Sequence, residues 1–431
     1  MWRIGPVLLL VVTLPASAAQ LTLQDCLARA SGASPRIAAA RLDAAAAAHR
    51  AAGIRARRFG SVDAVASWND YESNRILRPM AADLFVDPAK GFLQLPWASE
   101  QLHYGIAVQL PLLDAGKIDE SARAARAQAE GAGAMEQQVE EDVRFAVTTA
   151  VRSALALRHM LAASDAYVAA LERDATDADL RLRVGSSPAI DAQRVHFALA
   201  GAIADRESLR AQLRAAEAGL AALMGEDPPA DGYDLADETP EQPTSAPLPA
   251  PGVRRDVVAA EKLVEAAARR ERGTRKEFGP EVGLTFLFQQ HRAPSIDGMN
   301  THEFSVNLKL PLFDGGARLA ALAEARSAKA AAEERLRSRQ LEVAAQTTDA
   351  LARLDAARAQ LEAGRQQRAL GAEVARVEKL RLDQGVGRMD DYLVARAAEL
   401  RGESAYWQAL YGERNARDYY DYVTAGRYGH D

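Results

Sequence analysis

The stretch "LKLPLFDGGARL", from Leu308 to Leu319, repeats a pattern found 200 residues earlier in "VQLPLLDAGKID", from Val108 to Asp119. Each copy ends an alternating apolar run and begins a polar, alanine-rich one. Proline cannot donate to a β-ladder, and aspartate is a favourable helix N-cap. The motif therefore predicts a switch from strand to helix in both halves of the chain. The predicted junction residues are Pro111, Asp114, Gly116, Pro311, Asp314, Gly315 and Gly316.

Four segments before these junctions alternate between apolar and small or polar residues, at 62–71, 104–112, 281–289 and 304–312. Their length suits a tilted strand that crosses a bilayer, with one face toward lipid and the other toward water. Four strands are too few to enclose a lumen, since the smallest closed membrane barrels use about eight. A lone sheet in lipid would leave its edges unpaired. The chain is therefore expected to oligomerise, and three copies with twelve strands is the economical solution.

The rest of the chain is a tandem repeat with long helices. "LRLRVGSSPAIDAQRVHFALA" at 180–200 is echoed by "LRLDQGVGRMDDYLVARAAEL" at 380–400. Each unit reads as a helix, two strands, a long helix of about 100 Å and a return helix. The predicted domains are a signal peptide (1–19), a first repeat (20–225), a Pro-rich acidic linker (226–253), a second repeat (254–423) and a C-terminal tail (424–431).

Composition excludes several classes of function. The net charge of −6 provides no basic footprint for nucleic acid.

The first residues, "MWRIGPVLLLVVTLPASAAQ", have the charged start, apolar stretch and small-residue cleavage site of an export signal. The single cysteine, Cys26, lies too far past that site to carry a lipid anchor and matches no metal or redox spacing. After the signal no run of 18 apolar residues occurs, so a membrane helix is not expected.

No motif for catalysis or cofactor binding is present in the sequence. A phosphate-binding loop, a nucleophile elbow and a catalytic triad signature are all missing, which predicts a protein that is not an enzyme and holds no cofactor. His103, His291 and His302 fall at or near the presumed outer loops, but they form no H-x-H or H-x-x-x-H pair. They are interpreted as polar loop residues, and no metal site is predicted.

The tandem halves, the "LPLLDAGK" and "LPLFDGGA" junctions and the "VGSSPAID" and "QGVGRMDD" breaks together resemble the TolC family of outer-membrane efflux channels. The resemblance covers nearly the whole mature chain. It implies a homotrimer with one shared twelve-stranded β-barrel in outer-membrane lipid, continuous with an α-helical tunnel in the periplasm. It also implies a passive exit duct for efflux or type I secretion, joined to an inner-membrane pump through a periplasmic adaptor protein.

The resemblance assigns roles to the two breaks. It implies that the turn residues Val184, Gly185, Ser186, Gly385, Val386 and Gly387 contact the adaptor. It also implies an acidic ring at the entrance, to which Asp191, Asp390 and Asp391 contribute. A second ring aspartate of the family is replaced here by Val394. Arg388 lies one residue beyond the family position of a latch arginine, which suggests an Asp191–Arg388 pair.

Three alternatives remain open. Asp191 and Asp391 could simply act as N-caps of the return helices, alone or in addition to an entrance role. The chain as a whole could be a soluble periplasmic coiled-coil adaptor or scaffold without a pore. The four alternating strands argue against that second alternative. A periplasmic enzyme is a weaker rival, because the sequence contains no recognisable catalytic site.

Overall fold

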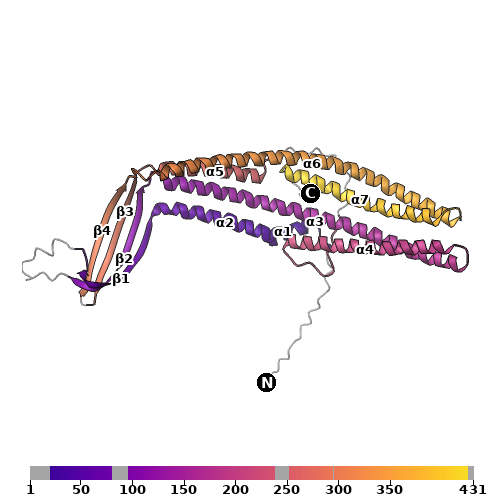
Figure 1. Cartoon of the computed structure of the whole chain (residues 1–431), viewed down its shortest axis with the longest axis horizontal. Coiled ribbons are helices and arrows are strands. Elements are labelled where there is room, and N and C mark those ends of the chain that lie inside the picture. The colour runs from indigo at the N-terminus through magenta and orange to yellow at the C-terminus, as the bar shows by residue number, and fades with distance from the viewer. Residues whose placement is uncertain (1–19, 80–95, 238–251, 295, 426–431) are drawn as a thin grey trace, which may run out of the picture. The chain divides into compact units, whose positions relative to one another are not determined.

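The computed structural model of the chain describes residues 20–79, 96–237, 252–294 and 296–425. The predicted signal peptide, residues 238–251 of the predicted linker and residues 426–431 of the predicted tail lie outside this part of the chain. Where it is described, the chain is mostly helical and contains a single antiparallel sheet (Figure 1).

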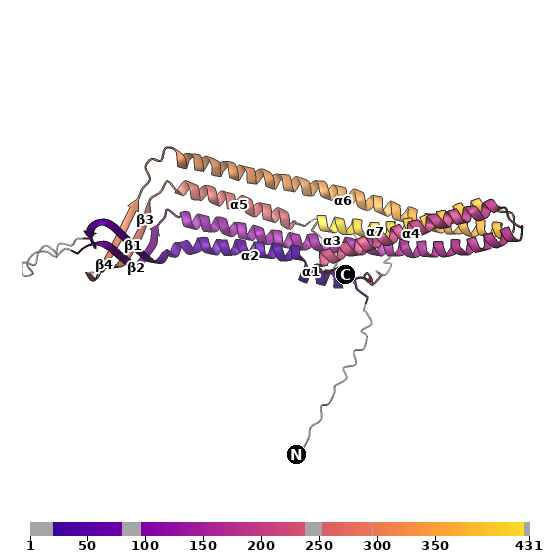
Figure 2. The same ribbon diagram turned by 60° about the horizontal axis from the view of Figure 1, so that its bottom comes forward.

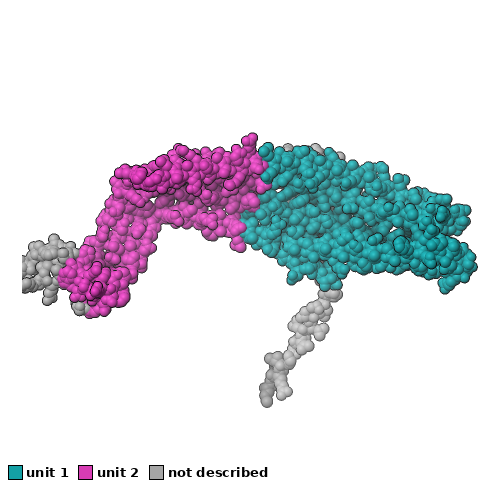
Figure 3. Space-filling model, in the orientation of Figure 1, with its two compact units in different colours: residues 1–40, 136–254, 341–431 teal, residues 41–135, 255–340 magenta. Residues whose placement is uncertain are grey.

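The chain divides into two compact units, and each sequence repeat contributes to both (Figure 3). Unit 1 contains residues 1–40, 136–254 and 341–431, and unit 2 contains residues 41–135 and 255–340. The division into units therefore does not follow the division into repeats. The repeats are consecutive along the chain, whereas each unit combines segments of both repeats that pack together.

Unit 2 contains the sheet, with strands in the order β1-β2-β3-β4. The strands are β1 (Ser61–Ile76), β2 (Trp97–Leu113), β3 (Glu281–Ala293) and β4 (Ile296–Lys309). Their register aligns the predicted alternation across all four strands. One row on the apolar face contains Val62, Val108, Phe286 and Phe304, and one row on the other face contains Ser61, Gln109, Thr285 and Ser305.

The four strands occur where the alternation predicts them, but their ends differ. β4 ends at Lys309, so Pro311 follows the strand as expected. β2 instead continues through Pro111 to Leu113, with a register shift against β3. The expectation that Pro111 ends its strand is therefore wrong. Proline is tolerated there because the pairing of β1 with β2 stops at Gln109, and because bulges accept residues that lack a backbone donor.

Four helical segments of unit 2 run side by side in both ribbon views (Figures 1 and 2). They belong to α2 (Pro35–Ala56), α3 (Lys117–Arg183), α5 (Arg255–Lys276) and α6 (Ala317–Asp383). Ion pairs join neighbours along their length. Lys262 of α5 lies 2.7 Å from Glu130 of α3, and Arg339 of α6 lies 3.7 Å from Asp256 of α5. The charged residues of these helices thus hold adjacent helices together as well as facing water.

Unit 1 has an apolar core in which α1 (Leu23–Ala33) packs with α3, α4 (Ala189–Met224) and α7 (Met389–Val423). The buried residues include Cys26, Val147, Leu220 and Tyr411. The single helix expected at the start of the first repeat is divided at Ser34, whose backbone is extended. A residue before proline is disfavoured in the α-helical region, and Pro35 begins α2. The break allows α1 to pack against the core in a direction that differs from that of α2.

The first part of the predicted linker, residues 226–237, also packs into this core. Leu235 is buried, and its carbonyl oxygen accepts a hydrogen bond of 2.7 Å from Arg158. Asp237 accepts hydrogen bonds from the Tyr411 hydroxyl at 2.8 Å and from His159 at 3.2 Å. A segment that composition alone reads as irregular is therefore anchored to α3 and α7 by side chains.

The tyrosine-rich end of α7 is likewise fixed in unit 1. Asp418 forms a largely buried ion pair with Arg152 of α3. The Tyr422 hydroxyl donates a 2.6 Å hydrogen bond to Asp142, and its ring stacks on Phe145 at 4.8 Å between centroids. Removing one partner of a buried ion pair is costly, because the other charge is left without compensation. The end of α7 is therefore a structural part of the unit.

Candidate functional site: the two inter-helix turns

The turn between α3 and α4 closes with two backbone hydrogen bonds. Ser186 donates to the Arg181 carbonyl at 2.9 Å, and Gly185 donates to the Leu182 carbonyl at 3.0 Å. This is the Schellman arrangement, in which the residue after the helix adopts a left-handed conformation. Gly185 has a φ of +72° and supplies that conformation without the steric cost of a side chain.

The turn between α6 and α7 repeats this geometry and adds one constraint. Val386 donates to the Arg381 carbonyl at 3.0 Å, and Gly385 has a φ of +75°. A Cβ atom added at Gly387 would lie 2.7 Å from the backbone nitrogen of Leu382. The second turn therefore has no room for a side chain at position 387. The next arginine along the chain is Arg388, which is the N-cap of α7.

Both turns expose an apolar side chain at their tips. Val184 is 68% exposed and Val386 is 69% exposed. Neither contributes to the apolar cluster that lies just behind the turns. That cluster is formed by α3, α4 and α7 and includes Leu171, Val195 and Tyr392. The two turns are therefore supported by buried helix residues, while the side chains of Val184 and Val386 remain exposed at the surface.

The predicted aspartates lie in the first turns of the return helices but do not act as N-caps. The N-cap of α4 is Pro188 and that of α7 is Arg388, and neither makes a side-chain capping bond. Asp191 is the third residue of α4, and Asp391 is the third residue of α7. The N-cap alternative is thus wrong. A negative charge in the first turn still interacts favourably with the helix dipole.

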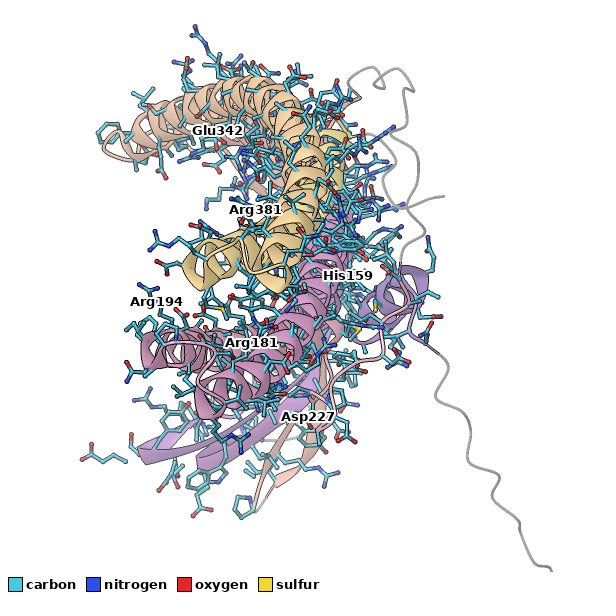
Figure 4. The ribbon with its side chains drawn as sticks, turned by 90° about the vertical axis from the view of Figure 1, so that its right-hand side faces the viewer. His159, Arg181, Arg194, Asp227, Glu342 and Arg381 are labelled. Carbon is cyan, nitrogen blue, oxygen red and sulfur yellow. The ribbon has the colours of Figure 1, made fainter. Side chains whose placement is uncertain are left out.

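The suggested Asp191–Arg388 pair does not form in the described chain. Instead, Arg194 of α4 lies between two of the predicted aspartates. Its guanidinium is 3.7 Å from Asp191 and 3.6 Å from Asp390, the second of which belongs to α7. Figure 4 shows the molecule from the side of the two inter-helix turns and labels Arg194. Its three-residue spacing from Asp191 could have indicated the first contact, but nothing local in the sequence points to Asp390.

Further polar contacts join the two hairpins behind Arg194. Arg181 of α3 lies 3.7 Å from Asp383 of α6. Lys379 of α6 lies 3.3 Å from Asp174 of α3, and the Tyr392 hydroxyl donates a 2.8 Å hydrogen bond to the same carboxylate. Burial and the neighbouring Asp174 raise the pKa of Tyr392 above its usual range. These contacts connect α3–α4 with α6–α7 close to the turns.

The charges at the turns are unevenly compensated. Asp390 and Asp191 share Arg194, whereas Asp391 is exposed and has no ion-pair partner among the described residues. Asp391 therefore offers the least screened negative charge of the three. The described chain contains no group of three or more His, Cys, Asp or Glu side chains arranged to hold a metal ion.

The two predicted strand-to-helix junctions lie in unit 2, and in both of them the aspartate accepts backbone hydrogen bonds. Asp114 accepts hydrogen bonds from the backbone of Gly116 at 2.9 Å and of Ile118 at 2.6 Å. Asp314 accepts from the backbone of Gly316 at 3.1 Å and of Arg318 at 3.1 Å. Each aspartate thereby satisfies orphan donors at the start of a long helix.

The two junctions differ in strain and in charge. Ala115 has a φ of +53°, a left-handed conformation that costs a residue with a Cβ atom about 1–2 kcal/mol, whereas the matching residue is Gly315. The second junction contains an ion pair in which Arg318 donates to Asp314 at 2.6 Å. That hydrogen bond holds the pKa of Asp314 below its usual value.

Comparison with known proteins identifies the class to which this fold and these turns belong. The chain matches the family model described as "Outer membrane efflux protein" over residues 26–226 and 251–417. The match covers most of the chain, so the protein belongs to the outer membrane efflux protein family. No described helix is both long enough and apolar enough to span a membrane.

Individual relatives agree with this assignment. The chain is 31% identical over 247 residues to the outer membrane protein OprJ of Pseudomonas aeruginosa, a match that spans 53% of this chain and 50% of OprJ. Among solved structures, the fold is similar to the CmeC outer membrane channel of Campylobacter jejuni (TM-score 0.81, 15% identity, 94% of this chain and 85% of CmeC). It is also similar to a membrane protein of Pseudomonas aeruginosa (TM-score 0.78, 23% identity, 93% of each chain).

Proposed function

We propose that the chain is the outer-membrane exit duct of a tripartite efflux system or a type I secretion system. Three copies would contribute four strands each to one twelve-stranded barrel, and their long helices would form a tunnel in the periplasm. The duct is a passive conduit without catalysis or cofactor, and it binds no nucleic acid. Its partners are a periplasmic adaptor protein and an inner-membrane pump, in keeping with the family to which the chain belongs.

The observation that carries this proposal is a sheet with two open edges. The strand order leaves one side of β1 and one side of β4 without a described partner. Unpaired backbone groups are costly in lipid, so a spanning sheet must close on itself. Four strands are too few to do so around a lumen. Neighbouring copies of the same chain supply the missing strands most simply.

The faces of the sheet support the same arrangement. On the apolar face, Val62 and Leu308 are each 71% exposed in the single chain, and Phe304 is 67% exposed. The cross-strand rows keep this apolar face continuous from β1 to β4. Lipid covers such a surface at no cost, whereas water does not. The apolar face therefore lies outward in the proposed barrel, and the polar face lines its lumen.

The two turns form the periplasmic entrance in this proposal. Copies of Asp390 and Asp391 around one symmetry axis would concentrate negative potential and favour cations. The exposed tips at Val184, Gly185 and Ser186, together with Gly385, Val386 and Gly387, would contact the adaptor. Arg194 replaces Arg388 as the latch that joins α4 to α7.

The deciding experiment measures assembly and conductance of the mature chain purified from the outer membrane. We expect native mass spectrometry to give three copies, and planar bilayers to show a cation-preferring conductance. Replacing Val306 and Leu308 with lysine should abolish insertion, because a charge on the lipid face costs about 2–4 kcal/mol near the bilayer centre. The control places lysines at Ser305 and Asn307 on the opposite face, where insertion should persist.

Equal behaviour of the two lysine pairs would reject the assigned facing of the sheet. A mature chain that remains monomeric and dissolves in water without detergent would reject the duct itself. That second outcome would favour the rival function, a periplasmic coiled-coil adaptor or scaffold. The exposed apolar face of the sheet and the family assignment argue against this rival.

A further inference from the structure

Two histidines lie side by side on neighbouring strands of the sheet in unit 2. His103 of β2 and His291 of β3 are register partners, and their Nδ1 atoms lie 2.7 Å apart. The pair is enclosed, since His291 is only 3% exposed. The sequence interpretation of both as loop residues is therefore wrong: each lies within a strand. Local spacing could not reveal the pair, because 188 residues separate the two histidines along the chain.

Hydrogen bonds fix the outer nitrogen of each ring. The side-chain amide nitrogen of Gln101 donates to two backbone carbonyls, at 2.9 and 3.0 Å, which assigns its oxygen Oε1 to face His103. That oxygen lies 3.2 Å from His103 Nε2, so in the neutral ring Nε2 carries the hydrogen and Nδ1 carries a lone pair. His291 Nδ1 must then be the donor between the rings. Its Nε2 lies 2.7 Å from the Thr301 hydroxyl, from which it accepts a hydrogen bond.

A single proton shift turns this pair into a chelate. If the hydrogen of His291 moves from Nδ1 to Nε2, the Thr301 hydroxyl rotates to accept it, and both Nδ1 atoms carry a lone pair 2.7 Å apart. We propose that His103 and His291 are the protein ligands of a divalent transition-metal ion. Imidazole nitrogen suits Cu²⁺, Ni²⁺ and Zn²⁺, and outer hydrogen bonds of this kind typically orient metal-binding histidines.

The geometry requires little movement. Metal–nitrogen distances of about 2.0–2.1 Å place two ligand nitrogens roughly 2.9–3.4 Å apart at the usual angles. The observed 2.7 Å needs to widen by a few tenths of an ångström, and the two rings need to turn so that both lone pairs meet at the metal.

The surroundings leave space for further ligands. The pair borders a cavity of about 430 Å³ that Ser67, Gln101 and Gln289 also line. Water molecules there can complete the coordination shell. Met299 is the register partner of His291 on β4 and lies on the same face of the sheet. Among these divalent ions Cu²⁺ binds nitrogen ligands most tightly, which makes it the probe of choice.

Arg78 lines the same cavity, and its Nε atom is buried without a hydrogen-bond partner among the described residues. A guanidinium is always charged, so it opposes the binding of a cation. The site is therefore expected to bind copper reversibly. Replacing the arginine by a neutral residue of similar size should tighten binding, an effect that no structural role of the histidines would produce.

The test titrates Cu²⁺ into the full-length chain, purified without a histidine tag, by calorimetry and electron paramagnetic resonance. We expect one ion per chain with hyperfine coupling to two imidazole nitrogens. His103→Ala and His291→Ala should each weaken binding more than about tenfold and remove one coupled nitrogen. Thr301→Val should weaken binding about tenfold, and Arg78→Gln should strengthen it.

The matched control is His302→Ala, next to Thr301 on β4, because His302 is exposed and lies on the opposite face of the sheet. Its copper affinity should equal that of the wild type. Wild-type affinity in either His103→Ala or His291→Ala would overturn the proposal. A wild-type spectrum without nitrogen coupling would do the same and needs no variant to fold. The outcome is independent of whether the chain conducts.

Discussion

The Arg194 contacts make the most specific prediction about the entrance. Arg194→Gln removes two ion pairs, one of which joins α4 to α7, and leaves a shorter, uncharged side chain. The side chains of Arg194, Asp191 and Asp390 are 36%, 23% and 51% exposed. Partly exposed pairs contribute about 0.2–1 kcal/mol each. Only the Arg194–Asp390 pair joins the two helices, so the loss that bears on their separation is up to about 1 kcal/mol per chain.

This loss has a measurable effect on an entrance that opens when α7 moves away from α4. A free-energy change of about 1 kcal/mol shifts the closed-to-open ratio about fivefold for one chain. If three chains open together, about 3 kcal/mol is lost and the ratio shifts more than about a hundredfold. Because partly exposed charges are screened by salt, raising the salt concentration should have a weaker effect of the same sign in the wild type.

The assay is the open probability of single channels in planar bilayers. We expect Arg194→Gln and Asp390→Asn each to raise it, and the double variant to add little to either. The control is Arg376→Gln, whose ion pair with Glu373 is contained within α6 and which should leave gating unchanged. An open probability in Arg194→Gln within twofold of the wild type would refute the latch. So would fully additive effects in the double variant.

Three further predictions concern single residues. Asp391→Asn should reduce cation preference in bilayers more than Asp390→Asn, because only Asp390 is compensated by Arg194; the reverse order would contradict the assigned charges. Ala115→Gly should raise the melting temperature by a few degrees because it relieves a left-handed alanine, and Gly315→Ala should lower it; a lower melting temperature for Ala115→Gly would count against strain at that junction. Cys26 is fully buried and burial raises its pKa to about 11, so the native chain should resist alkylation at pH 8 and react only when unfolded in urea; rapid native labelling would contradict the packing of α1.

The strands and junctions were predictable because their signals are local. A period of two over nine residues identifies a two-faced strand wherever it occurs. Proline, aspartate and glycine act on the backbone within a few residues of their own position, so Asp114 and Asp314 could be assigned to helix starts directly. The strand ends were less predictable, because the length of each strand depends on its neighbour. Pro111 lies inside β2 because β1 is no longer paired with β2 at that position.

The contacts at the two inter-helix turns were only half predictable from the sequence. The turn glycines Gly185 and Gly385 followed from helix-ending patterns, and their left-handed conformations agree with that origin. The partner of Asp390 did not follow, because Arg194 belongs to the other repeat. The interpretation of Arg388 as a latch came from its position in the chain. The structure leaves Arg388 without an ion pair among the described residues and uses an arginine one turn into α4.

The amino-acid order by itself determined the element types, the duplication and the two faces of the sheet, because backbone preference and side-chain alternation act over a few residues. Only the tertiary structure decided which distant side chains meet. It brought Arg194 to Asp390, the linker residue Asp237 to Tyr411, and His103 to His291. Such pairs depend on the packing of helices and on strand register, which fix separations of a few ångströms between residues that the chain places far apart.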